Sequence, residues 1–107
     1  MSKAIYDDDG RTLTLHPQGK TGVRLPRHRY EPVRTAILEI LPKRGPGPTF
    51  TDLAELIAPK LKGTDFPADA SVMWHCVSVK LDLEARGLIH RVPGTRPEEL
   101  LRGPAPE

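Results

Sequence analysis

The stretch that most restricts the fold is residues 70–86, which predicts a helix with apolar side chains on two opposite sides. Successive side chains of a helix are rotated by about 100°, so residues three and four apart share a face. One face carries Val72, Cys76, Val79 and Leu83. The opposite side carries Trp74, Val77, Leu81 and Ala85. Because a helix that is apolar all round is usually buried all round, we expect the first face to enter a core and the second to be covered.

Two apolar patterns upstream predict the helices that complete this core. The first should span residues 29–41, with Pro32 in its first turn, where a missing N–H costs no hydrogen bond. The second should begin at a Thr51 or Asp52 cap, and Pro59 should kink or shorten it. The two apolar stripes consist of Tyr30, Val33, Ile37, Ile40 and Leu41, and of Leu53, Leu56, Ile57 and Leu61. We therefore expect a bundle of three helices.

The N-terminal segment predicts a β-hairpin in which residues 4–6 and 11–15 flank the favoured turn Asp9-Gly10. An isolated hairpin is marginally stable in water, so this one should dock on the helices. Residues 16–26 should then connect it to the first helix as a loop.

Asp69 is the expected cap of the third helix, and Gly87 should end it. Residues 88–92 and 100–102 should follow as a C-terminal pair of strands, and residues 49–50 should form a short extended segment before the second helix.

These elements divide the chain into an N-terminal hairpin and loop (1–27), a helical domain (28–102) and a disordered tail (103–107). The single cysteine, Cys76, has no internal disulfide partner, which favours a reducing cytoplasm. The sequence contains no long apolar run, so it predicts neither a membrane segment nor a signal peptide. We expect a cytoplasmic protein without membrane contact.

Residues 83–91 carry the pattern Leu-Glu-x-x-Gly-Leu-Ile-x-Arg. This pattern resembles the end of the recognition helix and the first wing strand of bacterial winged helix-turn-helix proteins. The resemblance implies a mainly α fold with a small β wing: a three-helix winged-helix domain, here preceded by the N-terminal β-hairpin. The whole chain is also similar to a family of small, uncharacterised bacterial winged-helix-like proteins. Two features depart from the pattern, namely the extra hairpin and a turn over residues 63–69 that is longer than in a compact helix-turn-helix.

Winged helices commonly bind DNA, so the resemblance implies double-stranded DNA as a partner and a regulator-like function. Cations on the wing and near the first helix are placed to contact phosphates. The candidate nucleic-acid-binding residues are Arg24, Arg27, Arg29, Arg34, Ser71, His75, Ser78, Arg91 and Arg96. The outward side of the third helix, however, offers few of the side chains that read bases. The net charge is only +2, so ordinary solvated surface charge remains the other interpretation.

The alternative function is a protein-interaction or dimerisation module that uses Trp74, Val77 and Leu81. Two covers for this surface are open: Leu13 and Leu15 of the hairpin, which alternation places on one face, or the same surface of a second copy. A homodimer fits slightly better, because a lone hairpin offers few large apolar side chains.

No pattern in the sequence indicates catalysis, a metal site or a cofactor. The three consecutive aspartates at 7–9 lack the alternate spacing of a calcium loop. His75 and Cys76 are adjacent on a helix, so their side chains diverge. There is no glycine-rich phosphate loop and no nucleophile elbow. We therefore expect a protein that is not an enzyme and uses no cofactor.

Overall fold

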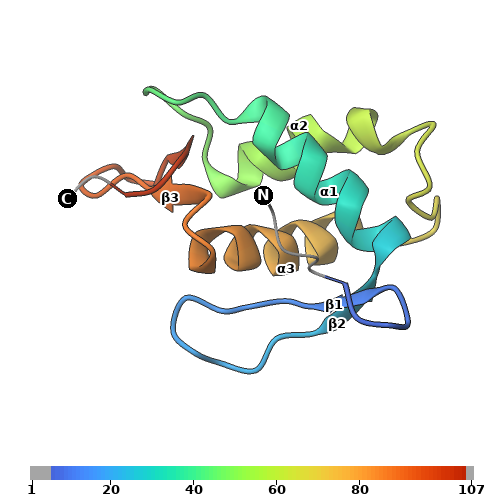
Figure 1. Cartoon of the computed structure of the whole chain (residues 1–107). Coiled ribbons are helices and arrows are strands. Elements are labelled where there is room, and N and C mark those ends of the chain that lie inside the picture. The colour runs from blue at the N-terminus through green and yellow to red at the C-terminus, as the bar shows by residue number, and fades with distance from the viewer. Residues whose placement is uncertain (1–5, 106–107) are drawn as a thin grey trace.

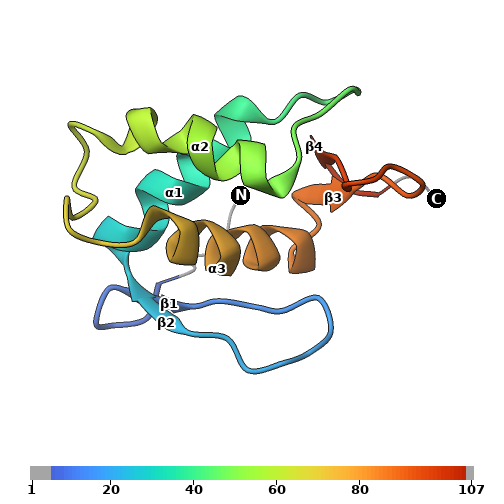
Figure 2. The same cartoon turned by 180° about the vertical axis from the view of Figure 1, so that it is seen from behind.

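Three helices pack around one apolar core in the computed structural model, which describes residues 6–105 (Figure 1). α1 spans Arg27–Ile40, α2 spans Phe50–Leu61 and α3 spans Val72–Ala85, which confirms the three predicted helices. In both views α3 lies between the pair α1–α2 and the N-terminal strands (Figure 2). Within residues 6–105, no helix is long and apolar enough to cross a membrane.

The N-terminal strands pair differently from the predicted hairpin. β1 (Arg11–Leu13) runs antiparallel to β2 (Arg24–Pro26), so the end of the predicted loop 16–26 is a strand. The two segments that follow β1 and precede β2 approach each other closely at Gly22. A Cβ atom at this position would lie 1.8 Å from the carbonyl oxygen of Thr14. Only glycine fits this approach, because it has no side chain. The pairing of β1 with β2 was not predicted, and most of the predicted partner strand, residues 4–6, lies outside the described residues.

A tight turn does form where Asp9-Gly10 predicts one. The amide of Asp7 donates to the carbonyl of Arg11 at 2.7 Å, and Gly10 adopts a positive φ of 74°. Within the predicted strand 4–6, residues 4 and 5 lie outside the described residues, and Tyr6 lies in a bend.

The C-terminal strands form the second pair. β3 (Ile89–Arg91) runs antiparallel to β4 (Leu100–Arg102), in agreement with the predicted pairing but over fewer residues. Thr49 forms a single β-bridge with Glu99, and the amide of Leu100 donates to the carbonyl of Pro48 at 2.8 Å. The connection between α1 and α2 therefore lies along β4, where the sequence predicts a short extended segment.

Both predicted caps are wrong by two or three residues. The Thr49 side chain accepts a hydrogen bond from the Asp52 amide at 3.3 Å, so α2 starts before the cap predicted at 51–52. The Ser71 hydroxyl accepts one from the third amide after it at 3.1 Å and replaces Asp69 as the cap of α3. Each hydroxyl satisfies one N–H that the helix itself leaves free.

Pro32 lies beyond the first turn of α1, because the helix begins at Arg27 and not at residue 29. The proline has no N–H, so the carbonyl of His28 lacks its helical partner. The prediction that Pro32 costs no hydrogen bond is therefore wrong.

The core combines residues from all three helices with a few from the strands and the α2–α3 connection. Its larger fully buried apolar members are Tyr30, Val33, Ile37, Leu41, Leu53, Ile57, Val79, Leu83, Ile89 and Leu100. Two predicted members differ: Leu56 is 47% exposed and Val72 is only partly buried. On α2 the small Ala54 faces the core instead of Leu56, and with the buried Ala36 it allows α1 and α2 to pack closely.

The N-terminal strands dock on the helices through Leu25 of β2 and through two threonines, and not through the predicted leucines of the first strand. Thr12 and Thr14 are buried, whereas Leu13 and Leu15 are exposed. Alternation does place the two leucines on one face, as predicted, but that face points away from the core.

Candidate functional site

One side of α3 presents large apolar side chains to solvent. Met73 and Trp74 are each 47% exposed and Val77 is 37% exposed, while Leu81 is partly buried one turn further on. We call these four residues the α3 apolar face. Leu13 and Leu15 are themselves exposed and leave Trp74 half in solvent, so the alternative in which the protein's own hairpin covers this surface is wrong. Exposed apolar side chains at consecutive turns of one helix are typical of an interaction surface.

The indole of Trp74 packs against the neighbouring imidazole, with ring centroids of Trp74 and His75 4.8 Å apart at an interplanar angle of 77°. Phe66 packs edge-on against the other part of the same imidazole at 4.9 Å. These edge-to-face contacts give Trp74 a defined position although half of it meets solvent. Within the apolar face, Trp74 is therefore held by a specific contact.

His75 is only 2% exposed, so the predicted role in reading bases does not fit its position. Its Nδ1–H donates to the carbonyl of Ser71 at 2.7 Å, which leaves Nε2 as the acceptor facing the Arg29 guanidinium at 3.4 Å. Burial lowers the pKa of His75, and the nearby charge of Arg29 lowers it further. Ser71 is occupied as the cap of α3. The structure thus assigns both residues to the architecture of the helix start.

A hollow adjoins the C-terminal end of the α3 apolar face. It has a volume of about 470 Å³, and its walls include Ala85 of α3 with Leu13 and Leu15 of the N-terminal segment. Ala85 follows Leu81 by one helical turn on the same side of α3. The exposed leucines therefore extend the apolar surface beyond the helix.

Asp82 is the residue that sequence reasoning missed, and it is completely buried. Its carboxylate accepts hydrogen bonds from the amide of Leu15 at 2.8 Å, from the Tyr30 hydroxyl, and from Arg86 Nε at 2.9 Å. Burial and the Asp82 carboxylate raise the pKa of Tyr30. One sequence signal was available: an aspartate beside the core stripe, one turn before an arginine.

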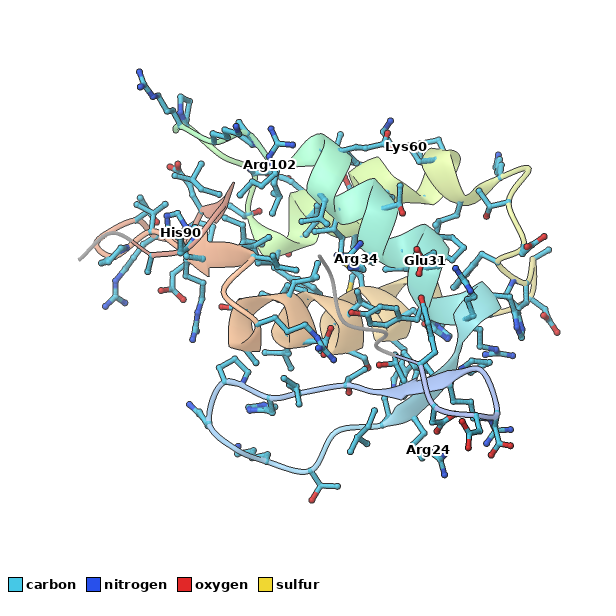
Figure 3. All side chains as sticks on the ribbon, in the orientation of Figure 1. Arg24, Glu31, Arg34, Lys60, His90 and Arg102 are labelled. Carbon is cyan, nitrogen blue, oxygen red and sulfur yellow. The ribbon has the colours of Figure 1, made fainter. Side chains whose placement is uncertain are left out.

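Two of the predicted cations near the first helix, Arg24 and Arg27, are engaged within the protein. Arg24 pairs with Asp7, and the Arg27 guanidinium lies 4.9 Å from the ring centre of Tyr6. Arg34 has a buried Nε with no hydrogen-bond partner among the described residues. Figure 3 shows Arg24 on the strands below α3 and Arg102 on the opposite side of the molecule. Arg24 therefore lies far from Arg102.

Arg91 on β3 belongs to a chain of ion pairs. Its Nε lies 2.8 Å from Glu84, which also pairs with Lys80 at 2.8 Å, and its guanidinium approaches Glu98 at 3.5 Å. This chain neutralises the cation that the sequence assigns to a phosphate contact. Of the other predicted residues, Ser78 is partly buried on α3 and Arg96 is exposed near the tip of the wing.

Four cations near the wing have no acidic partner within 4 Å in the part of the chain that the structure describes. They are Lys43, Arg44, Arg96 and Arg102. The first two precede the extended segment that lies along β4, and the amide of Arg102 donates to the carbonyl of Pro42 at 2.9 Å. We call them the wing-end cations.

A groove of about 830 Å³ lies along α1 and the end of α2. Its walls mix acids and bases, among them Glu31, Glu39 and Asp65 with Arg27 and Lys60, so they favour no one charge. Within residues 6–105 there is no group of three His, Cys, Asp or Glu side chains arranged to hold a metal ion. The α3 apolar face is therefore the surface with the clearest chemical character.

The fold and this surface define a small α/β domain of three helices and two antiparallel strand pairs with an exposed apolar helix face. The chain belongs to DUF6958, a family of unknown function, whose sequence model matches residues 11–100. No curated protein and no solved structure shows significant similarity to the chain.

Proposed function

We propose that this protein is a non-enzymatic protein-interaction module of winged-helix type that binds its partner through the α3 apolar face. The observation that carries the proposal is the exposure of Met73, Trp74 and Val77 at consecutive turns of α3. Aromatic residues and methionine are enriched in the centres of protein interfaces.

The winged-helix interpretation has support from the order and pairing of the elements. Three helices are followed by the β3–β4 pair, and Thr49 adds a bridge to Glu99 beside β4. In such a fold α3 is the helix that meets the ligand. Here that helix presents apolar side chains where a DNA reader needs polar ones, which favours a protein ligand for this face.

The test introduces a photo-crosslinking amino acid in place of Val77 in the cells that make the protein. We expect a discrete adduct that a protease degrades and a nuclease does not, and that disappears when Trp74→Ala is added. The same amino acid in place of Leu56, which is 47% exposed on α2, is the matched control and should give no adduct. Nucleic-acid adducts at position 77, or no adduct at all, would overturn the proposal.

A second candidate function is binding of a nucleic-acid backbone, and the unpaired wing-end cations favour it. Lysine and arginine side chains without acidic partners release counterions when they meet phosphates, so such binding weakens steeply with salt. This mode needs no base-reading residues on α3 and leaves the α3 apolar face free.

Titration with mixed-sequence duplex DNA at low and moderate salt tests this candidate. The double variant Lys43→Ala/Arg44→Ala should bind more weakly and reduce the salt slope by about 1 for each lost contact. Arg24→Ala is the control, because Arg24 is paired with Asp7 on the other side of the molecule. Absence of binding at low salt would exclude this second function.

A further inference from the structure

We propose that the start of α3 is an acid-sensitive switch. A second proton on the His75 imidazole, opposed by Arg29, releases the first turn of α3 and the α2–α3 connection (62–71) from each other and frees Trp74 from its packed position. The switch would regulate the α3 apolar face, so its effect on a partner rests on the proposed function. The conformational change itself does not depend on that function.

The imidazole of His75 joins the α2–α3 connection to α3. Its ring packs edge to face against Phe66 of the connection at 4.9 Å and against Trp74 of α3 at 4.8 Å. His75 and Phe66 are both buried. Because the ring lies between the two segments, movement of the ring into water separates Phe66 from α3 and removes the contact that positions Trp74.

The neutral imidazole fits the hydrogen bonds at this position and the imidazolium does not. Nδ1–H donates to the carbonyl of Ser71 at 2.7 Å, and Nε2 faces the Arg29 guanidinium at 3.4 Å. A neutral ring with its hydrogen on Nδ1 offers Arg29 the lone pair of Nε2. A second proton makes Nε2 a donor that faces another donor, and it places two cations side by side within the fold.

The packed state of the ring therefore resists protonation. Burial has the largest effect and lowers the pKa of His75, the Ser71 carbonyl acts in the opposite direction, and the charge of Arg29 on α1 lowers the pKa further. His75 also lies in the first turn of α3, where the positive end of the helix dipole disfavours a cation.

The other charged groups near this end of α3 are in water. The α2–α3 connection carries the carboxylates of Asp65 and Asp69, and the end of α2 carries Lys60 and Lys62. All four residues are exposed, so solvent screens their charges of both signs. The charge that faces the imidazole from another helix is that of Arg29.

Acid favours the released state. An imidazole in water has a pKa near 6.5, and that of the packed ring is lower. Below pH 6.5 the released ring therefore binds a proton that the packed ring does not bind. The equilibrium constant for release rises by up to about tenfold for each pH unit below 6.5, until the packed ring is protonated as well.

The segment that opens has few contacts with the core. Val72 at the start of α3 is only partly buried, and residues 62–65 of the connection are exposed. Further along α3, Val79 and Leu83 are completely buried. Regions with few buried apolar contacts open at a lower free energy than the core. We therefore expect the first turn to open while the rest of α3 stays folded.

Native-state hydrogen exchange above and below pH 6.5 tests the switch. The amides of Trp74 and His75 donate to Ser71. We expect their protection factors to fall by about tenfold from pH 6.5 to one unit lower, while those of Val79 and Leu83 stay constant. His75→Gln cannot take up a proton and should abolish the change. Equal losses of protection in the first turn and in the core, or an unchanged loss in His75→Gln, would overturn the inference.

Arg29→Gln tests the electrostatic part of the switch. Loss of this charge raises the pKa of the packed His75, so acid should cause a smaller loss of protection in the first turn. Arg27→Gln is the matched control on α1, because the Arg27 guanidinium lies over the Tyr6 ring, and it should behave as the wild type. A pH profile of Arg29→Gln identical to that of the wild type would overturn the inference.

The exchange experiment and the photo-crosslinking at position 77 fail independently. If the first turn shows the expected exchange but no adduct forms at position 77, the proposed function fails and the switch stands. If the adduct forms but the first turn and the core lose protection together, the switch fails and the proposed function stands.

Discussion

Asp82 ties three separate segments together through one buried carboxylate. Its hydrogen bonds reach the N-terminal segment at Leu15, α1 at Tyr30 and the end of α3 at Arg86. A buried charge is tolerated only when such partners compensate for the lost hydration. The residue therefore fixes where the N-terminal strands dock, a role that no apolar side chain at this position can take.

We predict that Asp82→Ala lowers the free energy of unfolding by about 3–5 kcal/mol. The substitution leaves the Tyr30 hydroxyl, the Leu15 amide and the Arg86 guanidinium without their hydrogen-bond acceptor. Urea denaturation measures this loss, and hydrogen exchange should show faster exchange of the Leu15 amide. Glu39→Ala is the control, since Glu39 pairs with Lys60 on the surface and should contribute less than about 1 kcal/mol. A loss for Asp82→Ala no greater than that of the control contradicts this role.

His75 makes the stability of the fold depend on pH. Burial holds its pKa below the ordinary value of 6.5, and the charge of Arg29 lowers it further. The unfolded chain then binds a proton more readily than the folded one, so this contribution is present above pH 6.5 and is lost as the pH falls below it.

We therefore expect the urea midpoint of the wild-type protein to fall with acidification below pH 6.5, and His75→Asn to weaken that dependence. Asparagine keeps a donor near the position of Nδ1 but has no proton to gain. His28→Asn, the same substitution at an exposed position of α1, is the matched control. Equal pH profiles for the wild type and His75→Asn would show that another group carries the effect.

At the scale of the elements, α3 has two apolar sides that differ in burial. One side packs with α1 and α2 in the core, and the other is left in solvent by every described segment. The N-terminal strands approach α3 through Thr12, Thr14 and the Asp82 hydrogen bond, so they flank the apolar face without covering it.

The contact between the α1–α2 connection and β4 depends on Gly47. A Cβ atom at this position would lie 2.1 Å from the carbonyl oxygen of Leu100, which is backbone and has little freedom to move. We predict that Gly47→Ala destabilises the protein by about 1–3 kcal/mol through overpacking. Thermal denaturation measures it, and Gly45→Ala is the control, since a Cβ there meets nothing closer than 3.7 Å. Equal midpoints for the two variants would show that the connection can shift away from β4.

At the scale of the whole molecule, the surfaces with distinct chemistry are separate. The α3 apolar face and the hollow beside Ala85 lie along one helix and the N-terminal segment, whereas the wing-end cations lie by β4 and the connection before α2. A protein partner on α3 and a polyanion at the wing end therefore do not compete for the same residues.

The sequence by itself determined the three helices, the C-terminal strand pair and most of the core. Helical periodicity located α1, α2 and α3, and glycine and proline located the turns, because these signals are local and depend on backbone geometry. The pairing of β1 with β2, the caps at Thr49 and Ser71, and the exposure of Leu56 were decided by tertiary packing, which local patterns do not record.

The candidate surface, too, was predicted only in part from the sequence. The sequence identified Trp74, Val77 and Leu81 as a second apolar side of α3, since helical phase alone places them together. Only the tertiary structure decided that this side stays exposed and that His75 is buried. The physical reason is that exposure depends on which distant segment covers a face, and here a buried aspartate and two threonines hold the N-terminal strands beside that face and not over it.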